Sequence, residues 1–111
     1  MRLFLTIAVL FLAACNDGKE YVRIPPDPSG KYQVILFKNI GDHMKILRTK
    51  RTGTELESIS TLLIDCQNDS FKELGEREEI KDVEKKYTAA DMSPAAGNVI
   101  GFYKVKYACA R

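Results

Sequence analysis

The start of the chain constrains its folding most, because it opens with an apolar run that is too short to cross a membrane. Met1 and Arg2 form a positive start, and residues 3–12 are uncharged and almost wholly apolar. A helix needs roughly 20 residues to span a hydrocarbon core, whereas about ten residues are typical of a signal-peptide core. We expect residues 1–14 to be removed as a signal peptide, which leaves 97 of the 111 residues to fold.

The run ends in Leu12-Ala13-Ala14-Cys15, which resembles the lipobox of bacterial lipoproteins. In that motif an aliphatic and two small residues precede the cysteine that receives a lipid. We therefore expect Cys15 to begin the mature protein and to carry a covalent diacylglycerol and an N-acyl chain such as palmitate. Each buried acyl methylene contributes about 0.8 kcal/mol, so the membrane anchor is effectively permanent. The alternative is an ordinary secretory signal that leaves Cys15 as a free thiol.

The residue after the expected anchor favours the outer membrane of the cell envelope. In enteric bacteria an aspartate directly after the lipidated cysteine retains a lipoprotein at the inner membrane. This chain has Asn16 there and Asp17 one place later. By resemblance to that rule, we expect a lipid-anchored protein of the outer membrane.

Size and charge narrow the class of protein. The chain has 17 basic and 15 acidic residues, and the signal removes only Arg2, so the mature net charge is +1. A near-neutral balance of charges argues against nucleic acid as a partner.

The small size of the domain favours a disulfide. A domain this small buries only about 60 to 65% of its unfolded surface, so it benefits from a covalent crosslink. In an oxidising compartment Cys66 and Cys109 are expected to supply it; a reactive thiol is the alternative.

The segment after the anchor has the composition of a spacer. Residues 16–30 are polar and include Pro25, Pro26 and Pro28. We expect residues 15–30 to form a lipidated, flexible tether, which at about 3.1 Å per residue reaches some 40 Å. In the alternative, Tyr21, Val22 and Ile24 add a short edge strand and shorten that reach.

The remaining residues, 31–111, are expected to form one small α+β domain. Apolar and β-branched runs separated by turn residues predict strands at 31–38, 43–51, 55–66, 71–74 and 99–109. The fold class is thus a small antiparallel sheet of about four to five strands with one short helix and one disulfide. The helix is expected over residues 76–87, where acidic residues come early, basic residues late, and an apolar stripe recurs at helical spacing.

The last predicted strand places a cysteine on an inward face. One face of this predicted strand, the face expected to point to the core, carries Tyr103, Val105, Tyr107 and Cys109. Leu62, Ile64 and Cys66 share a face of the earlier strand in the same way. Both sulfurs are therefore expected to face a common core.

Chemical motifs are scarce in this sequence. It has no glycine-rich phosphate loop, no paired-histidine zinc helix and no Cys-x-x-Cys, and His43 is the single histidine. We expect no enzyme activity, no metal and no cofactor beyond the lipid on Cys15. The alternative is that His43 acts as a general base paired with a serine.

The densest basic run is the candidate binding patch. It spans residues 45–51 and contains Lys45, Arg48, Lys50 and Arg51. Exposed together on a strand, these cations would meet acidic lipid headgroups, glycans or an acidic protein. The alternative is a solvated edge that blocks aggregation, with Glu55 and Glu57 neutralising it across a hairpin.

The order of landmarks in the mature chain resembles the surface-adhesin protein E family of Gram-negative lipoproteins. The matching residues are Leu63-Ile64-Asp65-Cys66, Phe71, Ser93-Pro94 and Cys109. The chain departs from the family in lacking a tryptophan ahead of the Ser-Pro element. The resemblance implies a small sheet with a helix, a bond between the two cysteines, and binding of host extracellular-matrix proteins by some members.

Together these features predict a non-enzymatic binding module of the cell envelope. Its expected partners are the membrane, through the lipid anchor, and a protein or glycan, as in a surface adhesin. The alternative function is exclusion of phage or plasmids, or inhibition of lysozyme, by an envelope lipoprotein.

The cysteine pairing can be tested directly. With Cys15 acylated, Cys66 can bond only to Cys109 within the chain, and closing a loop of about 43 residues removes denatured-state entropy worth roughly 4 kcal/mol. Mass spectrometry of the unreduced mature protein should show no free thiol, and Cys109→Ser should lose several kcal/mol of unfolding free energy. Two free thiols, or Cα atoms more than about 7 Å apart, would contradict the pairing.

Overall fold

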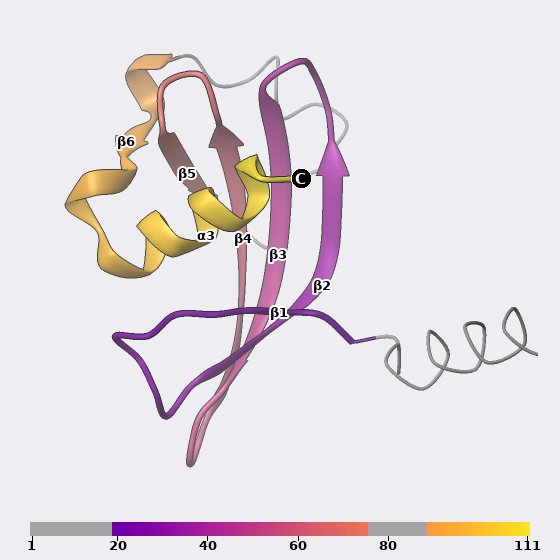
Figure 1. Cartoon of the computed structure of the whole chain (residues 1–111), viewed down its shortest axis with the longest axis vertical. Coiled ribbons are helices and arrows are strands. Elements are labelled where there is room, and N and C mark those ends of the chain that lie inside the picture. The colour runs from indigo at the N-terminus through magenta and orange to yellow at the C-terminus, as the bar shows by residue number, and fades with distance from the viewer. Residues whose placement is uncertain (1–18, 76–88) are drawn as a thin grey trace, which may run out of the picture.

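The computed structural model describes residues 19–75 and 89–111, which form a six-stranded antiparallel sheet with one α-helix on one face (Figure 1). The strands follow one another across the sheet in chain order: β1 Tyr21–Val22, β2 Lys31–Asn39, β3 Met44–Thr52, β4 Glu57–Asp65, β5 Ser70–Leu74 and β6 Ser93–Pro94. The helix, α3, covers Val99–Cys109, and 3-10 turns cover Ala89–Asp91 and Ala95–Gly97. The antiparallel α+β class is as predicted, with more strands than the expected four to five.

The centre of the sheet is the pairing of β3 with β4, which is apolar on both faces. Ile46 lies opposite Leu63 on one face, and Leu47 lies opposite Leu62 on the other. All four side chains are at most 4% exposed. The strand predictions for 31–38, 43–51, 55–66 and 71–74 are confirmed to within two residues, because continuous apolar runs are typical of strands buried on both sides.

The chain joins the sheet at Tyr21, inside the segment up to Gly30 that the sequence predicts to be a flexible tether. In β1, Tyr21 pairs with Gln33 and Val22 with Tyr32. Val22 and Ile24 are buried, at 4% and 5% exposed. The short edge strand of the alternative is therefore present as Tyr21–Val22, and the Val22 and Ile24 side chains complete the core under α3.

The prediction of a strand over residues 99–109 is wrong, because this segment is the helix α3. Apolar and basic residues alternate in the middle of this segment, which is the pattern of a half-buried strand. The buried residues, however, are spaced for a helix: Gly101, Lys104, Val105 and Ala108. The Asn98 side chain accepts a hydrogen bond from the Gly101 amide at 2.7 Å and caps the first turn. A helix satisfies its own backbone, so it can lie across the sheet face instead of joining an edge. The helix predicted over 76–87 lies outside the described residues.

The disulfide between Cys66 and Cys109 is present, as predicted. Their Cα atoms are 5.6 Å apart, which is within bonding geometry. Because Cys109 ends a helix, the bond joins the end of β4 to α3 and not two strands to each other. It fastens the C-terminal end of the helix to the sheet, while Val105 and Ala108 pack beneath it.

The close approach of α3 to β5 gives a stability test. A Cβ on Gly101 would lie 2.6 Å from the Phe71 ring, whereas a Cβ on Gly97 would meet nothing within 4 Å. Alanine normally stabilises a helix by about 1 kcal/mol over glycine. We expect overpacking to outweigh that gain, so Gly101→Ala should lower the unfolding free energy by about 1 kcal/mol.

Thermal unfolding of Gly101→Ala and of the matched variant Gly97→Ala measures this difference. Gly97→Ala should keep the Tm within a degree or two of the parent, since surface changes are usually worth less than about 0.5 kcal/mol. A higher Tm for Gly101→Ala would show that the Phe71 ring moves aside without cost.

Candidate functional site

The cations of the predicted basic patch do not form one exposed surface. The patch consists of Lys45, Arg48, Lys50 and Arg51. Because side chains alternate along β3, Lys45 and Arg51 lie on the face that α3 covers, whereas Arg48 and Lys50 lie on the opposite face. Lys45 is 9% exposed, and its ammonium donates to Asn39 Oδ1 at 2.6 Å. Arg48 Nε donates to Thr61 Oγ1 at 2.9 Å. The structure thus uses Lys45 and Arg48 to pack the sheet.

Arg51 instead belongs to a polar cluster that binds the loop after β1 to the sheet. Asp27 Oδ2 accepts hydrogen bonds from the Tyr32 hydroxyl at 2.6 Å and from Arg51 Nε at 2.9 Å. Asp27 Oδ1 accepts a further bond from Arg51 Nη2 at 3.2 Å. The Arg51 guanidinium, and then the Tyr32 hydroxyl, lower the pKa of Asp27 from 3.8 to about 2. We call these three residues the Asp27 clasp.

Lys104 extends the Asp27 clasp to α3. Its side chain is 5% exposed, and Nζ lies 5.2 Å from the centre of the Tyr32 ring. Burial lowers the pKa of Lys104, and the negative charge of Glu73 opposes that shift. A cation against an aromatic face recovers part of the lost hydration. Sequence reasoning missed this cluster, because Asp27 lies in a proline-rich segment and Lys104 in an apparent strand.

His43 and Asp65 form a long ion pair beside the start of β3 and at the end of β4. His43 Nε2 lies 3.9 Å from Asp65 Oδ1. The Asp65 carboxylate accepts bonds from the Gln67 and Asn68 amides at 2.9 and 3.3 Å and from Asn68 Nδ2 at 2.8 Å, so it shapes the turn into β5. Within residues 19–75 and 89–111, no hydroxyl bonds to His43, and no three metal-ligating side chains lie together.

An apolar groove lies between one flank of α3 and the segments around Asn68 and Ala95. We call it the α3 groove; its volume is about 540 Å³. It is lined by Asn68, Asp69, Pro94, Ala95, Ala96, Phe102, Val105, Lys106, Cys109 and Ala110. Phe102 is 43% exposed and packs edge-to-face on Tyr103, with ring centres 5.3 Å apart. Val99 and Ile100, at 57% and 37% exposed, lie on the same first turns of the helix.

The chemistry of this surface suits a binding site. Val99 and Phe102 are three residues apart on α3, so their exposed apolar side chains are neighbours on the helix surface beside the groove. The polar groups at the rim, Lys106 and Asp69, carry opposite charges. No motif in the sequence indicated the groove, since it forms only when 99–109 is helical and β6 lies beside it.

The Asp27 clasp predicts a pH-dependent contribution to stability. Because the folded-state pKa of Asp27 lies below its ordinary value, the contribution is complete above about pH 4 and is lost as the pH falls towards 2. Urea unfolding should find Asp27→Asn less stable than the parent at pH 6, with the difference shrinking between pH 4 and 2. Asp42→Asn, an exposed change in the β2–β3 turn, should stay near the parent. A difference for Asp27→Asn that does not change with pH would contradict the clasp.

Within the described ranges, no helix has the length and apolar character needed to cross a bilayer. Comparison with protein families, with curated proteins and with solved structures finds no significant match to this chain. The resemblance to the protein E family therefore stays a prediction, and the function has to be inferred from the chemistry of the surfaces.

Proposed function

We propose that this chain is a lipid-anchored lipoprotein of the cell envelope whose domain binds a protein partner through the α3 groove. The observation that carries the proposal is the exposure of Phe102 beside that groove. Phe102 is neither a core residue nor one of the side chains packed against the core, and it lies on a flank of α3 beside Val105, Lys106 and Cys109. Its 43% exposure leaves an aromatic anchor available to a partner.

The lining favours a protein over a glycan. Cores of protein interfaces are depleted in charge and contain aromatic anchors, with polar groups around the rim. Phe102, Val105 and three alanines line the groove, and Asp69 and Lys106 lie among its few charged residues. A glycan would require more hydrogen-bonding side chains than this lining offers.

The proposal requires no catalytic residue. The carboxylates of Asp27 and Asp65 are bonded to neighbouring groups that hold the loop after β1 and the turn before β5. The buried ammonium of Lys104 packs on Tyr32. The turn that Asp65 holds contributes Asn68 and Asp69 to the groove, so this carboxylate positions part of the lining.

The lipobox at Leu12–Cys15 supports the anchor, and Asn16 supports the outer membrane. Binding of host matrix proteins is the adhesin version of the proposal, and it additionally needs the groove to face the cell exterior. Protease treatment of intact cells distinguishes the two orientations, since only a surface-exposed domain is cleaved without breaking the cells.

Photo-cross-linking tests the groove. A photoreactive residue placed at position 102 of the lipidated protein in living cells should capture one discrete partner. The matched control is position 56, where Leu56 is 77% exposed at the β3–β4 hairpin tip. With the captured protein purified, Phe102→Ser should weaken binding by more than about tenfold, as expected for an interface anchor. Leu56→Ser should leave the affinity unchanged.

Two results would reject this function. Equal cross-linking from positions 102 and 56 would show that the groove has no specific partner. Unchanged affinity of Phe102→Ser would place the partner elsewhere on the domain. Purified matrix proteins, tested in the same affinity assay, decide the adhesin version.

A further inference from the structure

The sheet begins very close to the expected anchor. Tyr21 of β1 is the sixth residue after Cys15. Six fully extended residues span at most about 20 Å, whatever conformation they adopt. If Cys15 is acylated, β1 is therefore confined to a layer of about that thickness above the membrane, far closer than a 40 Å spacer would place it.

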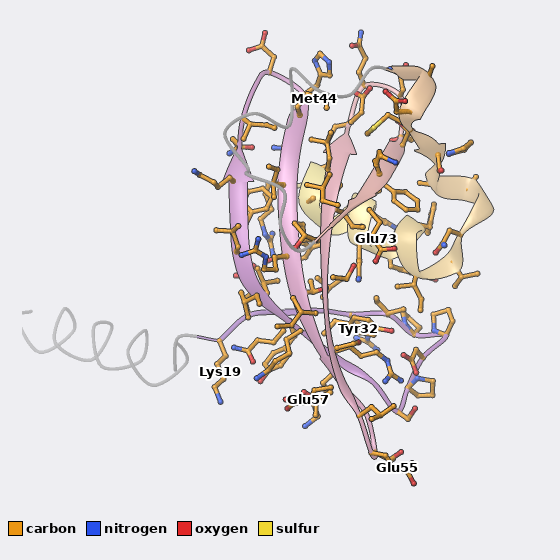
Figure 2. All side chains as sticks on the ribbon, turned by 180° about the vertical axis from the view of Figure 1, so that it is seen from behind. Lys19, Tyr32, Met44, Glu55, Glu57 and Glu73 are labelled. Atoms are coloured by element: carbon orange, nitrogen blue, oxygen red, sulfur yellow. A yellow bond between two sulfur atoms is a disulfide. The ribbon has the colours of Figure 1, made fainter. Side chains whose placement is uncertain are left out.

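The surface around β1 is basic and aromatic. We call it the β1 surface and define it by four exposed residues: Lys19, Tyr21, Arg23 and Lys31. Tyr21 is 47% exposed. A shallow hollow of about 650 Å³ between β1 and the following proline-rich loop is lined in part by Tyr21, Arg23 and Lys31. Figure 2 shows Lys19 at the outer side of the sheet, where the described chain begins.

The row of side chains that starts at Tyr21 continues across the sheet. Tyr21 pairs with Gln33, Gln33 with Lys50, and Lys50 with Ile59. Paired residues of an antiparallel sheet point to one face, and this face is opposite α3. Ile59 is 58% exposed, so an apolar residue and a further cation extend the β1 surface away from the α3 groove.

The nearest acidic groups leave the β1 surface positive. The Glu20 carboxylate pairs with Arg111 at 3.1 Å, and Asp27 is neutralised within its clasp by Arg51 at 2.9 Å. Glu57 is exposed on the same face as Lys31, but it lies two strands away, across Thr52. Within the described residues, Arg23 and Lys31 have no carboxylate partner of their own.

We propose that the β1 surface rests on the anionic phospholipid headgroups of the membrane to which Cys15 anchors the chain. Each Lys or Arg near an anionic bilayer contributes about 1 kcal/mol, and tyrosine is enriched at the headgroup level. This contact orients the domain, with the β1 surface towards the lipid and the α3 groove on another face. The inference rests on the anchor of the proposed function but not on the partner.

Fluorescence quenching in vesicles tests the contact. The natural chain has no tryptophan, so Tyr21→Trp gives the lipidated full-length mature protein a single tryptophan, whose emission can be excited selectively. This variant is reconstituted in phosphatidylethanolamine vesicles with or without phosphatidylglycerol. A lipid with a spin label on its headgroup should quench the introduced indole strongly in the anionic vesicles and much less in the zwitterionic ones. Arg23→Glu, added to this protein, should reduce quenching to the zwitterionic level.

The matched control is Lys38→Glu, which changes the net charge equally. Lys38 is exposed seven residues further along β2 than Lys31, so it lies about 23 Å away along the strand. It should leave the quenching unchanged. Equal quenching in both lipids, or an equal loss in Lys38→Glu and Arg23→Glu, would overturn the proposal.

The mass of the N-terminal peptide separates failure of the anchor from failure of the contact. If that mass shows an unacylated Cys15, the proposed lipoprotein function fails, and the same protein is tested by sedimentation with the vesicles. Combining Arg23→Glu with Lys31→Glu should then lower partitioning into anionic vesicles by more than about tenfold. Partitioning that matches Lys38→Glu would overturn the headgroup contact independently of the anchor.

Discussion

The rest of the structure depends on the pairing of β3 with β4. This hairpin is buried on both faces near the centre of the sheet, where Ile46 and Leu63 lie on one face and Leu47 and Ile64 on the other, all at 0% exposed. Because a strand alternates its side chains, two consecutive apolar residues in each strand serve two separate cores. The long hairpin extends beyond β5 and α3, and Glu55 lies at its tip (Figure 2).

Two further interactions attach the less regular parts of the chain to this hairpin. The Asp27 clasp fastens the loop after β1 to β2 and β3, and the disulfide fastens α3 to the end of β4. Lys104 links them, because it lies on α3 and packs on the Tyr32 ring. The two proposed surfaces are positioned in this way: the clasp holds the β1 surface and the disulfide holds the α3 groove.

Most strands could be predicted because their cause is local. The predicted runs 31–38 and 55–66 are rich in apolar and β-branched residues over a strand's length and are followed by turn residues. The disulfide could also be predicted, since only two cysteines remain after Cys15. Whether the basic run forms one exposed patch could not be predicted from the sequence. Its cations alternate between the two faces of β3, and three of them bind separate partners: Lys45 binds Asn39, Arg48 binds Thr61 and Arg51 binds Asp27.

By itself, the sequence determined the central antiparallel strands and the cysteine pair, each of which depends on residues that are adjacent in the chain or few in number. Only the tertiary structure decided that residues 99–109 form a helix. Their apolar pattern fits both the two-residue repeat of a strand and the 3.6-residue repeat of a helix. The helix forms because it lets Gly101, Val105 and Ala108 approach the sheet together. The same holds for the Asp27 clasp, whose carboxylate and guanidinium are 24 residues apart. Contacts of this kind form only after the sheet has brought distant segments within hydrogen-bonding distance.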